Sequence, residues 1–156
     1  MDKKFEKYVI NPFVLNELLK KTKFNFFSYD SLINENDVFE KMQNNKINNY
    51  QRTHIKNWAD YENNEKDLSQ KDFHNFFLMD IPPNELIILL THEGIILRKC
   101  VFKFYSAEFY AFSDLYEDYF SMEFFQLSYY LLIYPGLNML RFLDEDGGIN
   151  EYRIPK

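Results

Sequence analysis

Carboxylates are the side chains of this protein that are best placed to do chemistry, and they gather in two segments. The first is SDLYEDYFSMEFF at residues 113–125, where acids are interleaved with aromatic residues. The second is DEDGG at residues 144–148, followed closely by Glu151. Such groups can coordinate a hard divalent cation or attract a positively charged partner protein. Which of these two roles the carboxylates have depends on the helices, strands or loops that carry them.

The acids Asp144, Glu145 and Asp146, together with Glu151, make the best case for a metal site. Oxygen-rich loops suit Mg²⁺ or Ca²⁺, so a metal-dependent hydrolase that uses Asp144, Asp146 and Glu151 is one interpretation. The D-x-D-G fragment, however, lacks the remaining ligands and the terminal Glu of a calcium-binding loop. Acids before Gly-Gly are also typical of an exposed hairpin. We therefore predict a solvated hairpin, no metal and no cofactor, and keep the hydrolase as an alternative.

Other catalytic signatures are missing from the sequence. His54, His74, His92 and Cys100 follow one another at intervals of 20, 18 and 8 residues, without the close pairs that metal sites use. There is no glycine-rich phosphate loop and no GxSxG nucleophile elbow. Cys100 lies in the strand-like run RKCVFKF, where a small core residue is expected. The sequence therefore favours a protein that is not an enzyme.

Residues 113–125 have the pattern of an amphipathic helix. At about 100° per residue, Asp114, Glu117 and Asp118 fall in one arc together with Ser121. The opposite side carries apolar and aromatic side chains: Leu115, Tyr116, Tyr119, Phe120 and Met122. Ser113 is suited to be the N-cap. The pattern predicts a helix whose aromatic side packs on a sheet and whose carboxylates point into water.

Excess negative charge is confined to the second half of the chain. The net charge is -6; residues 1–78 hold 12 Lys and Arg against 12 Asp and Glu, whereas residues 79–156 hold 6 against 12. An acidic surface repels nucleic-acid phosphates and anionic lipids, so direct nucleic-acid and membrane binding are not expected. It attracts a basic protein and accelerates the encounter.

Tyrosines are concentrated in the same half, and they suit protein interfaces because a large contact area ends in a polar tip. They are Tyr105, Tyr110, Tyr129, Tyr130, Tyr134 and Tyr152. Acids flanked by tyrosines can neutralise a basic cleft on a partner, which makes this half a predicted partner-binding surface.

The totals predict one domain over residues 1–156, because 156 residues with 46% hydrophobic side chains are enough for a single core. The single cysteine indicates a reducing compartment. The sequence has no signal-peptide pattern and no apolar run near the roughly 20 residues that a spanning helix needs. We therefore expect a cytoplasmic protein.

The first part of the chain, about residues 1–80, has a helical pattern. Asn11-Pro12 is a good helix start, and Phe13, Leu15, Leu18 and Leu19 form a mostly apolar stripe after it. Further helices are predicted over residues 37–43, residues 51–62 and a short segment that includes residues 73–77.

The second part, about residues 81–156, has short apolar runs between turn residues. Strands are predicted over residues 86–91, 95–105, 126–134, 139–143 and 149–154, with a turn at residues 92–94 and another at Pro135-Gly136. The expected fold is α+β, with N-terminal helices packed on a mainly antiparallel sheet of about five strands in a single domain.

This order of helices followed by strands such as NELIILLTH, VFKFYS and FFQLSYYLLIYPGLNMLRFLDEDG resembles the small α+β cytosolic immunity proteins that bacteria encode beside toxins. The resemblance covers roughly residues 70–156. It implies a non-catalytic inhibitor that binds and neutralises one cognate protein toxin, often a nuclease.

The expected partner is thus a toxin with a basic surface. The residues expected to contact it are Tyr110, Asp114, Glu117, Asp118, Asp144, Glu145 and Asp146. Besides the hydrolase, a second alternative stays open, in which the aromatic surface forms a homo-oligomeric scaffold or regulatory module.

Overall fold

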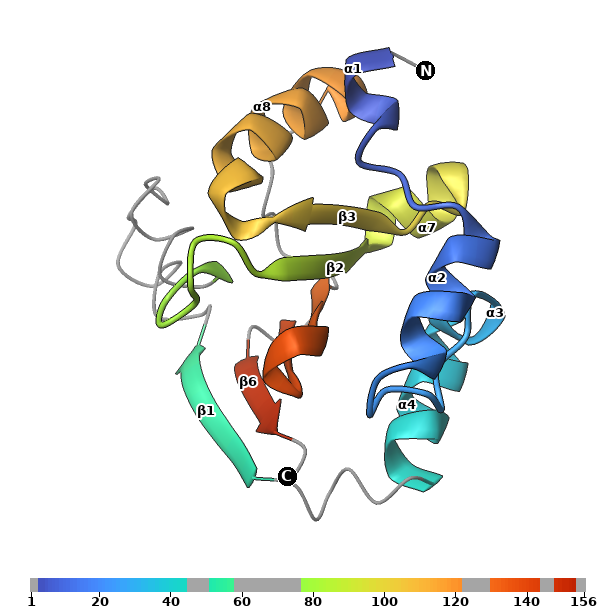
Figure 1. The fold of residues 1–156 in the computed structure, drawn as a ribbon, viewed down its shortest axis with the longest axis vertical. Helices are drawn as coiled ribbons and strands as arrows, with labels where there is room; N and C mark the ends of the chain where they lie inside the picture. Colours follow the sequence, from blue (N-terminus) through green and yellow to red (C-terminus); the bar gives the residue numbers. More distant parts are fainter. Residues whose placement is uncertain (1–2, 45–50, 58–76, 122–129, 144–147, 154–156) are drawn as a thin grey trace.

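The described residues form one α+β unit built on an antiparallel sheet. The structure is a computed structural model that describes residues 3–44, 51–57, 77–121, 130–143 and 148–153. Within these residues, six strands form one sheet in the order β1-β6-β5-β4-β2-β3, and all neighbours are antiparallel (Figure 1). The strands are β1 (Gln51–Asn57), β2 (Leu86–Thr91), β3 (Phe102–Tyr105), β4 (Tyr130–Tyr134), β5 (Met139–Leu143) and β6 (Gly148–Arg153). The predicted fold class is confirmed.

Helices cover both faces of this sheet (Figure 1). One face packs against α1 (Lys3–Glu6) and α8 (Phe109–Phe120), and the other against α2 (Pro12–Lys20), α3 (Tyr29–Leu32) and α4 (Glu35–Asn44). Because side chains alternate along a strand, Ile87 and Leu89 of β2 enter the first core, while Ile88 and Leu90 enter the second. Burial on both faces explains the continuous apolar runs of β2 and β4.

The exposed edge of β3 is partly protected by the N-terminal segment. The Ile10 amide donates to the Val101 carbonyl at 2.9 Å, and the Lys103 amide donates to the Tyr8 carbonyl at 2.7 Å. The next outward amide, that of Tyr105, donates to a carboxylate oxygen of Glu108 at 3.1 Å. These bonds satisfy donors that an unprotected edge would offer to another chain.

The start of α2 is confirmed by its cap. Asn11 Oδ1 accepts from the amides of Phe13 at 2.8 Å and Val14 at 3.4 Å, and Pro12 occupies the first turn. Leu15 and Leu19 are fully buried. Phe13 was predicted on the apolar stripe, but it is 72% exposed, because it lies outside the arc that faces the sheet. The helix predicted over residues 37–43 is confirmed as α4, with Val38 buried.

The prediction of a helix over residues 51–62 is wrong where the structure describes it. Residues 51–57 form β1, which pairs with β6 from Gln51–Arg153 to Asn57–Gly148. Pairing with a strand almost a hundred residues away overrides the local three- and four-residue pattern. The sheet therefore has six strands where about five were predicted, and one of them, β1, lies within the part of the chain that was predicted to be helical. Residues 58–62 lie outside the described residues.

A second correction concerns residues 92–98, which form helix α7 (His92–Arg98) instead of a turn and the start of a strand. Thr91 Oγ1 caps this helix by accepting from the Gly94 amide at 2.9 Å, and Lys99 ends it with a left-handed φ of 51°. Gly94 is required by packing, since a Cβ there would lie 2.6 Å from Cε2 of Phe102. Only Phe102–Tyr105 of the predicted strand is a strand.

The other strand predictions agree with the structure where it describes them. β2 and β5 have the predicted bounds, β6 begins one residue earlier than predicted, and β4 accounts for the described part of residues 126–134. Pro135-Gly136 opens a 3₁₀ turn, after which Asn138 has a φ of 50°. The helix predicted near residues 73–77 lies almost wholly outside the described residues. No helix in the described ranges is long and apolar enough to cross a membrane.

Candidate functional site

The outer side of α8 carries the predicted acidic stripe. Tyr110, Asp114 and Asp118 are exposed and Glu117 is half-exposed, and all four fall within one arc of the helix. The opposite side is buried through Phe109, Phe112, Ser113 and Tyr116. The predicted separation of carboxylates from aromatic side chains on this helix is therefore confirmed.

Ser113 is not the N-cap of this helix, as the sequence predicted. The helix starts at Phe109, directly after the 3₁₀ turn Ser106–Glu108, so Ser113 lies in its interior and is only 8% exposed. Aromatic packing explains the earlier start, because Phe109 and Phe112 belong to the same buried side as Tyr116 and extend the apolar pattern by a full turn. The helix ends at Phe120, and Ser121 follows with a left-handed φ of 53°.

A cluster of aromatic rings holds α8 against β3 and α1. The ring of Phe112 stacks on Phe104 of β3 with centroids 4.6 Å apart, and Tyr119 stacks on Phe5 of α1 at 5.0 Å. Phe77 stacks on Phe109 at 5.0 Å. Stacked and edge-to-face rings add to the free energy of simple apolar burial, so this helix is fixed firmly to the sheet.

The hydroxyl of Tyr116 adds a polar anchor inside the core. It lies 2.9 Å from Thr91 Oγ1 and 3.1 Å from a carboxylate oxygen of Glu93. A carboxylate can only accept, so Tyr116 donates to Glu93 while Thr91 serves as its second partner. Burial is the main cause that raises the pKa of Tyr116 well above its ordinary value of 10.0, and burial likewise raises the pKa of Tyr134.

These two tyrosines predict a steep loss of stability in alkaline solution. Both hydroxyls stay neutral in the folded protein, whereas in the unfolded chain they ionise near pH 10. Above pH 10 these two tyrosines should therefore lower stability by about 1.4 kcal/mol per pH unit each, in addition to the loss from Cys100 and Tyr29, whose pKa values burial also raises. Urea unfolding between pH 8 and 11.5 measures this slope. Tyr116→Phe should lower the slope above pH 10 by about 1.4 kcal/mol per pH unit, and Tyr105→Phe, at a position that is 52% exposed, should leave it unchanged. Equal slopes in all three proteins would contradict the assignment.

A shallow apolar depression adjoins the tyrosine end of the acidic stripe. Its volume is about 260 Å³, and Tyr110 lines it together with Ala107, Ile81 and Pro83. Tyr110 is 39% exposed and Tyr105 is 52% exposed, so both can contact a partner. Tyr130 and Tyr134, which the sequence placed in the same interface, are fully buried because β4 is covered on both faces. Their predicted role at the surface is wrong, and Tyr129 lies outside the described residues.

The sequence around the acidic stripe contains acidic residues but no basic ones. Residues 104–140 contain no Lys or Arg. Described cations on other elements lie near the C-terminal half of α8. The Arg98 guanidinium lies 5.3 Å from the centroid of the Tyr119 ring, and the exposed lysines Lys3 and Lys4 belong to α1, which packs there through Phe5. The stripe thus has no compensating cation on α8 itself.

The second acidic segment belongs to a different part of the sheet. β5 and β6 pair in the predicted hairpin register, with Leu143 opposite Ile149. Asp144, Glu145 and Asp146 lie in the connection between them, outside the described residues. Strands β4 and β2 separate this hairpin from β3, beside which α8 packs.

Glu151, the fourth acid of the alternative metal site, is committed to an internal ion pair. Its two carboxylate oxygens accept from Arg141 Nε at 3.1 Å and from Arg153 Nε at 2.8 Å. Arg141 is 2% exposed and its second nitrogen, Nη2, donates to the Met79 carbonyl at 2.8 Å. Two guanidinium groups already neutralise this carboxylate, which makes it a poor ligand for a cation. Within the described residues, no group of three His, Cys, Asp or Glu side chains could hold a metal ion.

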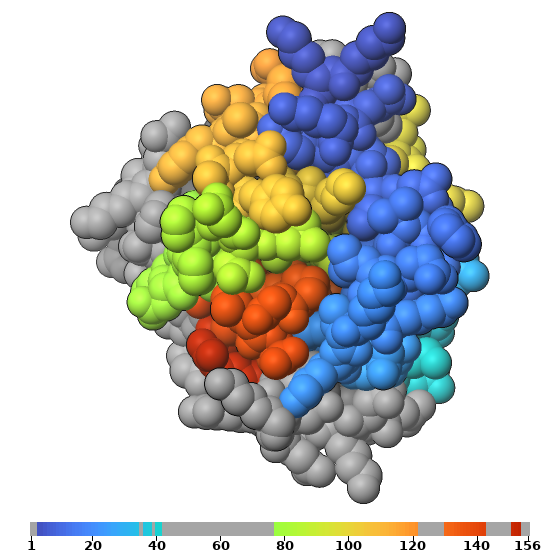
Figure 2. Space-filling model, viewed as in Figure 1, coloured from blue at the N-terminus to red at the C-terminus, as the bar shows by residue number. Residues whose placement is uncertain are grey.

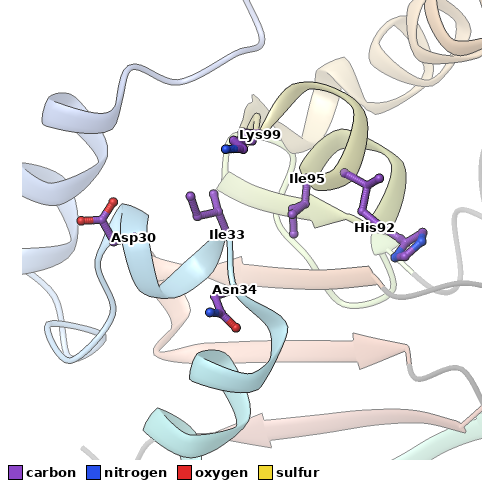
Figure 3. Close-up of a pocket in the computed structure, with 7 residues that line it drawn as sticks. Asp30, Ile33, Asn34, His92, Ile95 and Lys99 are labelled. Carbon is purple, nitrogen blue, oxygen red and sulfur yellow. The ribbon is translucent and has the colours of Figure 1, made fainter.

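A cavity with a partly polar lining, which the sequence did not predict, lies between α3 and α7. Its volume is about 450 Å³, and its polar lining comes from Asp30, Asn34, His92 and Lys99 around isoleucine side chains. Figure 3 shows Asp30 and His92 at opposite ends of this group, with their polar atoms pointing apart. Acid–base and nucleophilic catalysis need convergent groups within hydrogen-bond reach, so this lining does not form a catalytic set.

Cys100 behaves as the small core residue that the sequence predicted. It is 9% exposed, and its Sγ donates to the Arg98 carbonyl at 3.4 Å. Burial raises the pKa of its thiol, although the Arg98 charge opposes that shift. A thiol that stays protonated is a poor nucleophile. Cys100 precedes β3 instead of lying within it.

The fold and this surface define a small α+β protein with helices on both faces of an antiparallel sheet and an acidic, tyrosine-tipped helix on its outside. No family model, no curated protein and no solved structure matches the chain.

Proposed function

We propose that this protein is a non-catalytic inhibitor that binds and neutralises a cognate bacterial protein toxin in the cytoplasm. The contact surface is the outer side of α8, from Tyr110 through Asp114 and Glu117 to Asp118. The observation that carries the proposal is this arrangement: an exposed tyrosine and exposed carboxylates in one arc, beside an apolar depression of about 260 Å³.

The chemistry of this surface suits a basic cleft on a partner. The carboxylates supply long-range attraction, which raises the association rate with a positively charged protein. Tyr110 and the depression beside it supply apolar contact, which is where interfaces obtain most of their binding energy. The firm packing of α8 on the sheet keeps the stripe in one geometry before the partner arrives, and a preorganised surface loses less entropy on binding.

Co-expression with the product of the adjacent reading frame tests this proposal. If that product carries a toxic C-terminal domain, the wild-type protein should restore growth and bind the domain with a rate that falls as salt is raised. The double substitution Asp114→Lys with Asp118→Lys should lower the association rate at least about tenfold and weaken the rescue.

The matched control is the double reversal Asp30→Lys with Glu40→Lys, at exposed positions on α3 and α4, on the other face of the sheet. It changes the net charge in the same direction but should leave rescue near the wild-type level. Equal effects of both reversals would show that only net charge matters, and full rescue by the α8 double variant would exclude this surface as the contact.

A further inference from the structure

A second apolar surface lies on the opposite side of the 105–110 segment from the acidic stripe, between α2 and β3. It consists of two adjoining depressions, of about 470 Å³ and 220 Å³, that share Leu18 as a common wall. Figure 2 shows α2, in blue, directly beside the gold β3 region on one face of the molecule. We call this surface the α2–β3 groove.

Large apolar side chains are unusually exposed along the α2–β3 groove. Phe13 is 72% exposed, Tyr105 is 52% exposed and Val14 is 46% exposed, and all three line it. The depression on α2 is lined mainly by apolar atoms of Phe13, Val14 and Leu18. Contiguous exposed apolar side chains of this size are typical of interaction sites.

The rim of the groove is basic once internal contacts are counted. Lys7, Lys21 and Lys103 line it, and in the described part of the chain none of them forms an ion pair. Of the two carboxylates on the rim, Glu17 pairs with Lys20 at 3.1 Å, while Glu108 accepts the Tyr105 amide and keeps its charge, so three lysines face one unpaired carboxylate. The groove thus combines an apolar floor with unpaired positive charge, in a protein whose net charge is -6.

We infer that the α2–β3 groove binds an acidic amphipathic segment of a partner protein. Apolar side chains of that segment cover Phe13, Val14 and Leu18, and its carboxylates face Lys7, Lys21 and Lys103. Addition of the segment as an extra strand is disfavoured, because the outward amides of Lys103 and Tyr105 already have acceptors. Binding in this groove through a helical apolar stripe is the mode that remains. This inference is independent of the proposed function, which rests on α8.

Fluorescence anisotropy with the full-length protein tests the inference. The probe is a labelled amphipathic peptide of about 15 residues, built from Leu at helical spacing and Glu elsewhere. It should bind at low ionic strength, and Phe13→Ser and Lys103→Glu should each weaken binding about tenfold or more. Lys3→Glu, the same charge change at an exposed position outside the groove, is the matched control and should leave the affinity unchanged. Circular dichroism verifies that each variant is folded.

The inference would be overturned by any one of several results. They are the absence of binding, equal binding of the same peptide with Lys in place of Glu, undiminished binding by Phe13→Ser, and a dimer in sedimentation velocity that Phe13→Ser abolishes. The last would assign the groove to a second copy of this chain. Preferential binding of single-stranded oligouridine, with loss on Lys103→Glu, would assign it to nucleic acid and would likewise reject the acidic segment.

Discussion

Replacing Arg141 by Met is expected to lower the free energy of unfolding by about 3–5 kcal/mol, because it removes the inner partner of a buried carboxylate. Glu151 is 9% exposed and would keep only Arg153, whose side chain is 50% exposed. Since Arg153 still neutralises part of the charge, a value near 3 kcal/mol is the more specific expectation. Urea unfolding at neutral pH measures it.

Arg141 also ties an irregular segment to the sheet. Its Nη2 donates to the Met79 carbonyl, and its guanidinium lies 5.5 Å from the centroid of the Tyr134 ring. The Tyr134 hydroxyl in turn donates to the Phe77 carbonyl at 2.7 Å. The carbonyls of Phe77 and Met79 therefore depend on side chains of the sheet for their hydrogen-bond donors. Amide hydrogen exchange in this segment should accelerate in Arg141→Met beyond the change expected from global stability alone.

The double variant Arg141→Met with Glu151→Met separates charge from packing. Removing both charges leaves no unpaired carboxylate in the interior, so most of the lost stability should return. If the double variant is as unstable as Arg141→Met, the bonds to residues 77–79 dominate instead. A loss below about 1 kcal/mol in the single variant would show that Arg153 alone neutralises Glu151.

Local rules were sufficient to predict from the sequence those helices and strands whose ends are set by their own residues. Asn11 and Pro12 define the start of α2, and their cap is a contact across three residues. Strands β2 and β5 are short apolar runs between turn residues, and both have the predicted bounds. The acidic stripe of α8 followed from helical spacing alone, because the period of a helix fixes which side chains share a face.

Elements that depend on distant partners could not be predicted in this way. β1 is a strand because it pairs with β6, and no pattern within residues 51–57 predicts that pairing. The ion pair between Arg141 and Glu151 requires the β5–β6 register, in which these two residues are direct partners. A signal was present in hindsight: each is a charged residue in a strand next to a hairpin, at positions that a tight hairpin places opposite each other.

The candidate site was predicted only in part for the same reason. Spacing placed Asp114, Glu117 and Asp118 on one side of α8, but it did not reveal the depression beside Tyr110, which also requires Ile81 and Pro83. The α2–β3 groove is formed by segments about ninety residues apart in the chain, so only the fold brings Leu18 beside Tyr105. The sequence predicted Phe13 on the apolar stripe of α2, but its side chain is exposed. That exposure is the feature that reveals the groove.

Replacing Phe112 by Ala is expected to lower the free energy of unfolding by about 3–5 kcal/mol and to loosen α8 in particular. Phe112 is fully buried, and its ring packs against three rings from other parts of the chain. Its ring centroid lies 4.6 Å from that of Phe104 in β3, 5.4 Å from that of Tyr8 and 6.0 Å from that of Phe5 in α1. The truncation opens a cavity at the point where these elements meet, and close-packed neighbours can refill it only in part.

This second substitution links stability to the proposed contact surface, because Phe112 lies on the same helix as Tyr110 and Asp114 but on its buried side. Hydrogen exchange should accelerate over residues 109–120 more than over α2. If the proposed toxin partner binds α8, its affinity should also fall, although no surface group has changed. The matched control is Phe13→Ala, at a side chain that is 72% exposed, which should change stability by no more than about 0.5 kcal/mol. A Phe112→Ala protein that unfolds like the wild type would mean that Phe109, Tyr116 and Tyr119 hold α8 without it. The preorganised stripe would then rest on their contacts with Phe77, Thr91, Glu93 and Phe5.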